Sequence, residues 1–448
     1  MLRRCLVLAC LLALGALAAC SSVIDADQAR ICRTLIPALN PADAVLAITR
    51  TVPLAQAREL RIFYTARQPG LPVRNRAVTC TFSGAGLSRN KLELLAVGTE
   101  AGPLSQSADY FLRRFYLGAP DFTLLDPAGI GSGQALPEVP RAVAYGVQQF
   151  LGALPQAGVY ALLAASYSLI YGLVGRIVFG FGEIAAIGGY GAMLGVFFAL
   201  QVGIEHPVAG LALAALFGAV AATMHGAVAG RLVVAPLVTA SGLSVLIGTT
   251  GLMLVLGEYL RIAQGSDLRW IPPVFNTPIA LMRAGSFVTT VTPVGLTSAL
   301  GCAVAAAGVL VVMRRTGFGR AWRAYADDPL TAALFGVDRW RIFGGTFALS
   351  SALAGFAGVV MTGYYGGLGY GMGLVLGLKA LVAAVVGGIG SPGGALAGGL
   401  VIGLAEALWS ATMPIESRDI AVFALLAIVL ALRPGGLKGF GDLLPRRV

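Results

Sequence analysis

Long apolar runs follow one another from about residue 157 onward, and short polar segments separate them. A helix crosses the hydrocarbon core of a bilayer with roughly 20 apolar residues, and most of these runs reach that length. We expect about nine membrane-spanning helices, within a range of about eight to ten, because glycine-rich segments can be broken or re-entrant. The expected spans are residues 157–175, 184–203, 207–233, 239–262, 291–313, 341–363, 373–390, 394–411 and 419–433.

The first 20 residues have a different pattern. Arg3 and Arg4 precede a short apolar core and then small residues, which is typical of a secretory signal peptide. Leu17-Ala18-Ala19-Cys20 also resembles the lipobox of bacterial lipoproteins, which would make Cys20 a lipidated residue. An uncleaved signal anchor that happens to contain a cysteine is the alternative.

Residues 21–145 are polar enough to fold in water. Strands are expected at 60–64, 77–82 and 92–97 and a helix at 104–117, which predicts a small exported α+β domain. In an oxidising compartment Cys32 and Cys80 could pair and stabilise this small core by a few kcal/mol. Two free buried thiols are the alternative.

Composition agrees with a polytopic helical membrane protein, since 57% of the residues are hydrophobic, 12% are charged and the mean hydropathy is +0.81. The net charge of +11 does not indicate nucleic-acid binding, because many arginines lie in short loops between apolar runs. Such placement follows the positive-inside rule. The Arg-rich segment 314–341 should then be cytoplasmic, with the N-terminal domain periplasmic and the C-terminus cytoplasmic.

Two apolar stretches, 179–190 and 377–394, are interrupted by glycines, and each has one charged residue a few positions before a Gly-Gly pair. Broken segments in the two halves of a transporter indicate a translocation pathway, and ionisable residues at membrane depth are functional candidates. Close helix packing is the alternative, and an ion pair between Glu183 and Lys379 is a further possibility. The pathway candidates are Glu183, Gly188, Gly189, Lys379, Gly387 and Gly388.

Other ionisable residues give weaker indications of a functional site. Glu258 and Arg261 are spaced i,i+3 and suggest an interfacial pair rather than a substrate site. His206 and His225 are isolated, and no Cys/His cluster has the spacing of a metal site. The sequence also lacks a G-x-x-x-x-G-K-[ST] motif, so we expect a chain that binds no cofactor and hydrolyses no ATP itself.

The segment 314–341 predicts a short amphipathic helix. Apolar side chains recur at Phe318, Trp322 and Tyr325, whereas Arg320 and Arg323 are polar. Such a helix at a membrane face suits docking into a groove on a partner. An interfacial helix that only anchors the loop is the alternative.

Several motifs in the second half of the chain resemble one family and occur in its order. They are Arg315-Thr316-Gly317-Phe318-Gly319-Arg320-Ala321-Trp322-Arg323-Ala324, Asp328, Ala332, Leu334, Gly336, Val337, Gly377-Leu378-Lys379-Ala380, Gly387-Gly388-Ile389-Gly390-Ser391, Gly403-Leu404-Ala405-Glu406 and Arg433-Pro434-Gly435-Gly436-Leu437. Residues 150–440 are thereby similar to the permease subunit of branched-chain amino-acid ABC transporters, a subfamily that includes urea and amide permeases.

The resemblance implies a non-enzymatic importer subunit of the bacterial inner membrane that works by alternating access. It implies ABC ATPase subunits that bind ATP, a second related permease subunit and a periplasmic substrate-binding protein as partners. Segment 314–341 would be the coupling loop, with Gly319, Arg320, Arg323, Asp328 and Gly336 as candidate contacts.

Substrate identity is less constrained by the resemblance. The run Val178-Phe179-Gly180-Phe181-Gly182-Glu183 keeps the family's Gly-Glu but lacks its Asn and His, and the N-terminal domain is additional to the minimal family. Urea or a short amide is therefore the alternative substrate class. A proton-coupled secondary transporter is a further alternative, although Glu183 alone supports it only thinly.

Overall fold

A computed structural model of the chain describes residues 25–437, with gaps at 42–43, 55–57, 69–71, 85–89, 101, 106–107, 110–111, 113–135, 205, 271–275, 277 and 286. The predicted signal peptide and Cys20 lie outside the described residues, as does most of the helix predicted at 104–117. The chain divides into two compact units. The small unit is Met1–Pro140, Ala199–Gly210 and Val274–Thr292, and the helical unit is Arg141–Phe198, Leu211–Pro273 and Pro293–Val448.

An antiparallel meander forms the sheet of the small unit, in the order β1-β2-β3-β4-β5. Alternate residues of β2 are buried, as expected for a strand with one face on a core. Three of the strands overlap the predicted ones, whereas β1 was not predicted. The strands are β1 (Val45–Pro53), β2 (Glu59–Arg67), β3 (Arg74–Phe82), β4 (Leu94–Thr99) and β5 (Gly102–Pro103).

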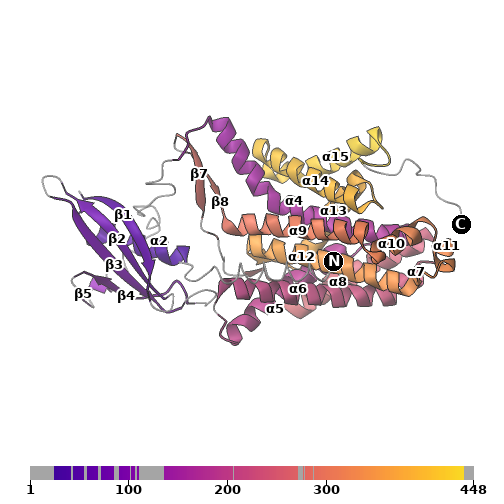
Figure 1. Cartoon of the computed structure of the whole chain (residues 1–448), viewed down its shortest axis with the longest axis horizontal. Coiled ribbons are helices and arrows are strands. Elements are labelled where there is room, and N and C mark those ends of the chain that lie inside the picture. The colour runs from indigo at the N-terminus through magenta and orange to yellow at the C-terminus, as the bar shows by residue number, and fades with distance from the viewer. Residues whose placement is uncertain are drawn as a thin grey trace. The chain divides into compact units, whose positions relative to one another are not determined.

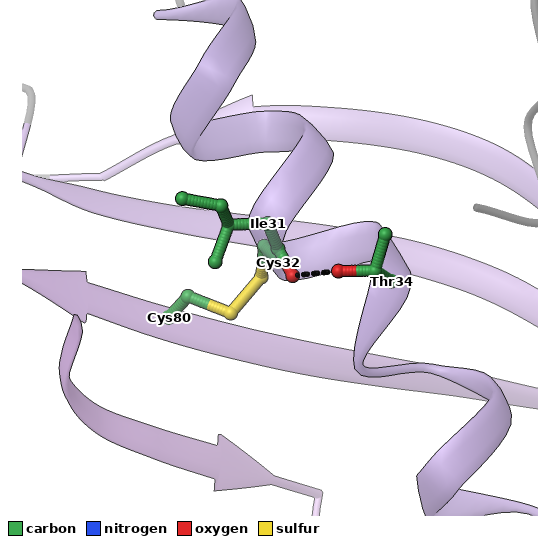
Figure 2. Close-up of a disulfide and its surroundings, with 4 residues drawn as sticks. All are labelled: Ile31, Cys32, Thr34 and Cys80. Carbon is green, nitrogen blue, oxygen red and sulfur yellow. Dashed lines mark hydrogen bonds between the residues drawn. A yellow bond between two sulfur atoms is a disulfide. The ribbon is translucent and has the colours of Figure 1, made fainter. Parts of the chain in front are cut away.

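The helix α2 (Ala26–Thr34) packs on this sheet and is followed by a short 3₁₀ turn, η1 (Pro37–Leu39). Asp25 caps α2 by accepting from the backbone N–H groups of its first turn. Cys32 of α2 is joined to Cys80 of β3 by a disulfide, with the two Cα atoms 6.0 Å apart (Figure 2). Both cysteines are fully buried, so the bond ties the helix to the centre of the sheet.

Nine helices of 15 residues or more make up most of the remaining described chain. Seven of them, with α6 and its continuation counted as one, are long and apolar enough to cross a membrane. The spans expected at 373–390 and 419–433 correspond to the shorter helices α13 and α15. The nine are α4 (Arg141–Val174), α5 (Phe181–Gln201), α6 (Pro207–Ala229), α8 (Gly242–Gln264), α9 (Pro293–Arg315), α12 (Arg339–Tyr365), α13 (Met372–Gly387), α14 (Pro392–Thr412) and α15 (Arg418–Leu432).

Short elements connect these helices. A π-helical turn continues α6 into a last short helix. The strands β7 and β8 form a local hairpin, whereas β6 and β9 pair across a long sequence separation. Two short helices lie in the segment 314–341. These elements are η5 (Gly230–Val234), α7 (Ala235–Leu237), β6 (Arg269–Trp270), β7 (Ile279–Ala284), β8 (Phe287–Val291), α10 (Gly317–Asp327), α11 (Pro329–Leu334), β9 (Gly367–Leu368) and η6 (Ile415–Ser417).

The helix α4 is the centre of the helical unit. It has 34 residues and therefore a length of about 50 Å, and almost every side chain in its second half is buried. It contacts α9, α12, α13 and α14, and Figure 1 shows it running alongside α14. A methyl group at Gly399 or Gly403 of α14 would overlap the α4 backbone, so small residues allow this close approach.

Candidate functional site

Glu183 lies in the first turn of α5, immediately after the break at Gly180, whose φ of +110° favours glycine. Its side chain is buried, with 4% of the residue exposed. The Oε2 atom has no hydrogen-bond partner among the described residues. A buried carboxylate without a partner is energetically unfavourable, so this is a candidate for contact with something outside the described chain.

A narrow recess surrounds this carboxylate, and its walls come from α4, α5, α8 and α13. Glycines bring two of these helices together, because a methyl group at Gly182 would overlap the carbonyl oxygen of Gly373. A methyl group at Gly373 would itself lie 2.5 Å from Glu183 Oε2. The absence of side chains at these positions therefore lets the α13 backbone lie directly beside the carboxylate.

Lys379 does not face Glu183. Its Nζ atom donates to Glu406 Oε1 at 2.8 Å and lies 2.6 Å from Asp419 Oδ1. The Lys379 and Glu406 side chains are 3% and 2% exposed, so this is a buried ion pair between α13 and α14. The Glu183–Lys379 pair considered from the sequence is wrong, because Lys379 points toward two other carboxylates.

Further polar groups complete this cluster. The Tyr160 hydroxyl donates to Glu406 Oε2 at 2.8 Å and accepts from Gln156 Nε2 at 2.9 Å. Tyr365 donates to Gln156 Oε1 at 2.9 Å, and Arg418 lies 3.4 Å from Glu406 Oε1. The Lys379–Glu406 cluster therefore links α4, α12, α13, α14 and α15, and its buried charges have partners, as a stable buried pair requires.

Sequence reasoning missed most of this cluster. Glu406 was noticed only as part of a motif, and Tyr160 and Asp419 were not considered. The signal that could have found them is the presence of Lys379 and Glu406 in apolar segments, since opposite charges at membrane depth tend to pair with one another. The exposed pair of Glu258 and Arg261 is confirmed, with 2.6 Å between Oε2 and Nη2.

Three of the four candidate glycines lie at helix contacts. A methyl group at Gly188 would overlap the backbone of Gly355, and one at Gly189 would meet the Thr362 hydroxyl. A methyl group at Gly387 would overlap Gly394, which holds α13 against α14. Gly388 ends α13 with a φ of +103°. Packing accounts for Gly188, Gly189 and Gly387, and the positive φ accounts for Gly388. A role in lining a pathway stays a prediction.

In the segment 314–341, the predicted amphipathic helix is α10, which Thr316 caps by accepting from the Gly319 N–H at 3.2 Å. Its apolar side faces inward, because Trp322 and Tyr325 are buried. The Trp322 indole N–H donates to the carbonyl of Leu169 in α4 at 3.2 Å. The apolar stripe therefore attaches α10 to the central helix rather than leaving it open to a partner.

Four of the five candidate coupling residues shape the same segment. Gly319 lies against the Met313 backbone, and the Arg323 guanidinium donates to the Met313 carbonyl at the end of α9. Asp328 caps α11 by accepting from two backbone N–H groups, at 3.0 and 3.2 Å. Gly336, with a φ of +83°, lies just after α11, whereas Arg320 is exposed.

The short helix α11 has the opposite character to α10. We call Leu330, Leu334, Phe335 and Trp340 the α11 patch, and these residues are 74%, 87%, 85% and 64% exposed. Several large apolar side chains exposed so close together are unusual on a polar connecting segment and are typical of an interaction site. Sequence periodicity had pointed to α10 and did not separate the roles of the two helices.

Comparison with known proteins identifies the class of molecule that this helical unit defines. Residues 149–431 match the family described as branched-chain amino acid transport system / permease component, so the chain belongs to that family.

Among the described residues, no group of three or more His, Cys, Asp or Glu side chains could hold a metal ion.

Individual relatives support the same assignment. The chain is 32% identical over 295 residues to the high-affinity branched-chain amino acid transport system permease protein LivH of Escherichia coli. The aligned region covers 66% of this chain and 96% of LivH. The chain is 31% identical over 294 residues to the corresponding permease protein BraD of Pseudomonas aeruginosa, covering 65% of this chain and 95% of BraD. No solved structure matches the chain.

Proposed function

We propose that the protein is the membrane-spanning subunit of an ABC importer for branched-chain or related amino acids in the bacterial inner membrane. The observation that carries the proposal is the match over residues 149–431, which spans most of the helical unit. LivH and BraD, which align over almost their whole length, are named for high-affinity branched-chain amino acid transport. Transport proceeds by alternating access and is driven by ATPase subunits that other chains supply.

Segment 314–341 receives the ATPase. The α11 patch offers apolar side chains to a groove on that subunit, and Arg320 lies exposed nearby on α10. Movement of α11 passes to α10, with which it shares the Asp328 junction. It then passes to α4 through Trp322 and to α9 through Arg323. The connection suits a coupling element because each step is a direct packed or hydrogen-bonded contact.

The small unit is periplasmic and the C-terminus is cytoplasmic in this proposal. Two features support it: the arginines of segment 314–341, which favour the cytoplasmic side, and the disulfide, which forms in oxidising compartments. The signal predicted at residues 1–20 would export the small unit, with or without lipidation at Cys20. A second permease subunit and a periplasmic substrate-binding protein complete the importer.

Uptake by cells tests the substrate class. A strain that lacks the gene would be compared with the same strain complemented by it, using labelled leucine and labelled urea. The proposal predicts that the gene restores leucine uptake. Restoration of urea uptake alone would assign the importer to the alternative class of urea and short amides.

A further inference from the structure

We propose that the Glu183 carboxylate receives the ammonium group of the amino acid as it passes through the helical unit. This inference rests on the proposed function and deepens it, because it names the chemical group that the pathway recognises. The starting observation is that Glu183 is buried while its Oε2 atom has no hydrogen-bond partner among the described residues.

A buried carboxylate needs a positive charge or several hydrogen-bond donors to offset its lost hydration. Within the described chain, no lysine, arginine or histidine forms an ion pair with Glu183 at 4.0 Å or less. Lys379, a buried cation on the neighbouring helix α13, is already paired with Glu406 and Asp419. A primary ammonium group carries both the charge and the donors that Glu183 lacks.

The residues that line the recess around Glu183 suit an ammonium group and the carbon chain attached to it. Gly182, Gly373 and Gly377 leave the helix backbones bare next to the carboxylate. Tyr167 also lines the recess, and its hydroxyl lies beside Gly377. Met253 and Leu378 supply apolar surface for an aliphatic side chain.

The recess is narrow in this conformation. It has no room for even a water-sized molecule, so it does not admit an amino acid as it stands. Substrate would reach Glu183 when α5 and α13 separate. The helix α13 also contains Lys379, so it joins this recess to the Lys379–Glu406 cluster. A shift of α13 would therefore change the contacts at both sites.

The test uses the importer reconstituted in lipid vesicles with its ATPase, second permease subunit and binding protein. Leucine is supplied at a saturating concentration. Two variants are compared with wild type: Glu183→Gln, which removes the charge, and Glu183→Asp, which keeps it. Glu258→Gln is the control, because Glu258 is an exposed carboxylate on a helix of the same unit. The two measurements are leucine transported and ATP hydrolysed.

For Glu183→Gln we expect leucine transport to fall about tenfold or more, which corresponds to about 1.4 kcal/mol or more of lost interaction. ATP hydrolysis stimulated by the binding protein should persist, so that less leucine is moved for each ATP. Glu183→Asp should recover much of the transport, and Glu258→Gln should resemble wild type. A purely structural role would not separate the Gln and Asp variants in this way.

Two results would overturn the inference. One is wild-type transport by Glu183→Gln, and the other is equal loss in the Gln and Asp variants with the complex intact, which would indicate packing rather than charge. Failure of the wild-type importer to move any amino acid is a separate result. It would contradict the proposed function and, with it, the ammonium site.

Discussion

Lys379 and Glu406 form a buried ion pair, with 2.8 Å between Nζ and Oε1, that joins α13 to α14. The two residues are 27 positions apart, and Asp419 of α15 approaches the same Nζ atom at 2.6 Å. Lys379, which the sequence indicated as a candidate for a translocation pathway, thus has two carboxylate partners. Its described contacts hold three helices at the C-terminal end of the chain together.

Removal of the Lys379 charge should destabilise the helical unit. In Lys379→Met, Glu406 stays buried and, among the residues that the structure describes, keeps only Arg418, at 3.4 Å, as a nearby cation. Breaking a buried pair typically costs about 3–5 kcal/mol, and we expect the lower end of that range because Arg418 compensates in part. Thermal unfolding of the purified protein in detergent would measure this loss of stability.

The double variant Lys379→Met/Glu406→Gln provides the matching test, because it removes both charges and should recover part of the lost stability. Arg261→Gln is the control, since the Glu258–Arg261 pair is exposed and such pairs contribute about 0–1 kcal/mol. Unfolding temperatures that are equal for wild type and Lys379→Met would show that the pair does not hold the helices together.

The α11 patch should carry binding of the ATPase subunit. Replacing Leu334 and Phe335 by serine removes the two most exposed apolar side chains of the patch without touching a buried contact. We expect co-purification of the ATPase to fall at least tenfold, because central apolar residues dominate interface energies. Leu95→Ser, at an exposed apolar position of the small unit, is the control. Undiminished co-purification of the double variant would rule out the patch as the docking surface.

Trp322 should transmit movement rather than bind the partner. Gly172 of α4 lies directly under its ring, and a methyl group there would overlap the indole. Gly172→Ala should therefore displace α10 from α4 and reduce transport several-fold while the ATPase still co-purifies. The measurement is leucine uptake together with the amount of bound ATPase.

Gly308→Ala is the matched control, because a methyl group at this position of α9 meets nothing within 4 Å. It should transport like wild type. If the two alanine variants behave alike, the contact between Trp322 and α4 has no part in coupling.

The Cys32–Cys80 bond should stabilise the small unit by about 4 kcal/mol, the value expected for a closed loop of this size, with 48 positions between the cysteines. Protein purified from membranes should migrate differently on a denaturing gel with and without reductant. Cys32→Ser should abolish that difference, whereas Cys302→Ser, at a buried free cysteine of the helical unit, should not. Equal migration of the wild-type protein in both conditions would contradict the bond and weaken the periplasmic placement.

The sequence was sufficient for features that depend on neighbouring residues. Runs of apolar residues located the long helices, and the spacing of Trp322 and Tyr325 located α10. Apolar runs bounded by Gly and Pro located β2 and β3, but β1 was missed. None of the residues of β1 is buried, and Val45 at its start is exposed. Such local patterns reflect the periodicity of helices and strands themselves.

Contacts between distant segments were beyond the sequence. Lys379 could have paired with Glu183 or Glu406, and only the packing of α13 against α14 decides between them. The glycines at 188, 189, 387 and 388 likewise looked like breaks, whereas three of them lie inside helices at places where another chain segment comes close. Which side of α10 faces the membrane domain was equally undetermined, because an apolar stripe suits an internal contact and an external one alike.

We propose above that this chain is the permease subunit of an ATP-driven amino-acid importer. The most direct measurement is uptake of labelled leucine into lipid vesicles that contain the chain with its partner permease and ATPase subunits, in the presence of the binding protein. We expect leucine uptake that requires ATP. Uptake that proceeds without ATP, or uptake of urea with none of leucine, would contradict it.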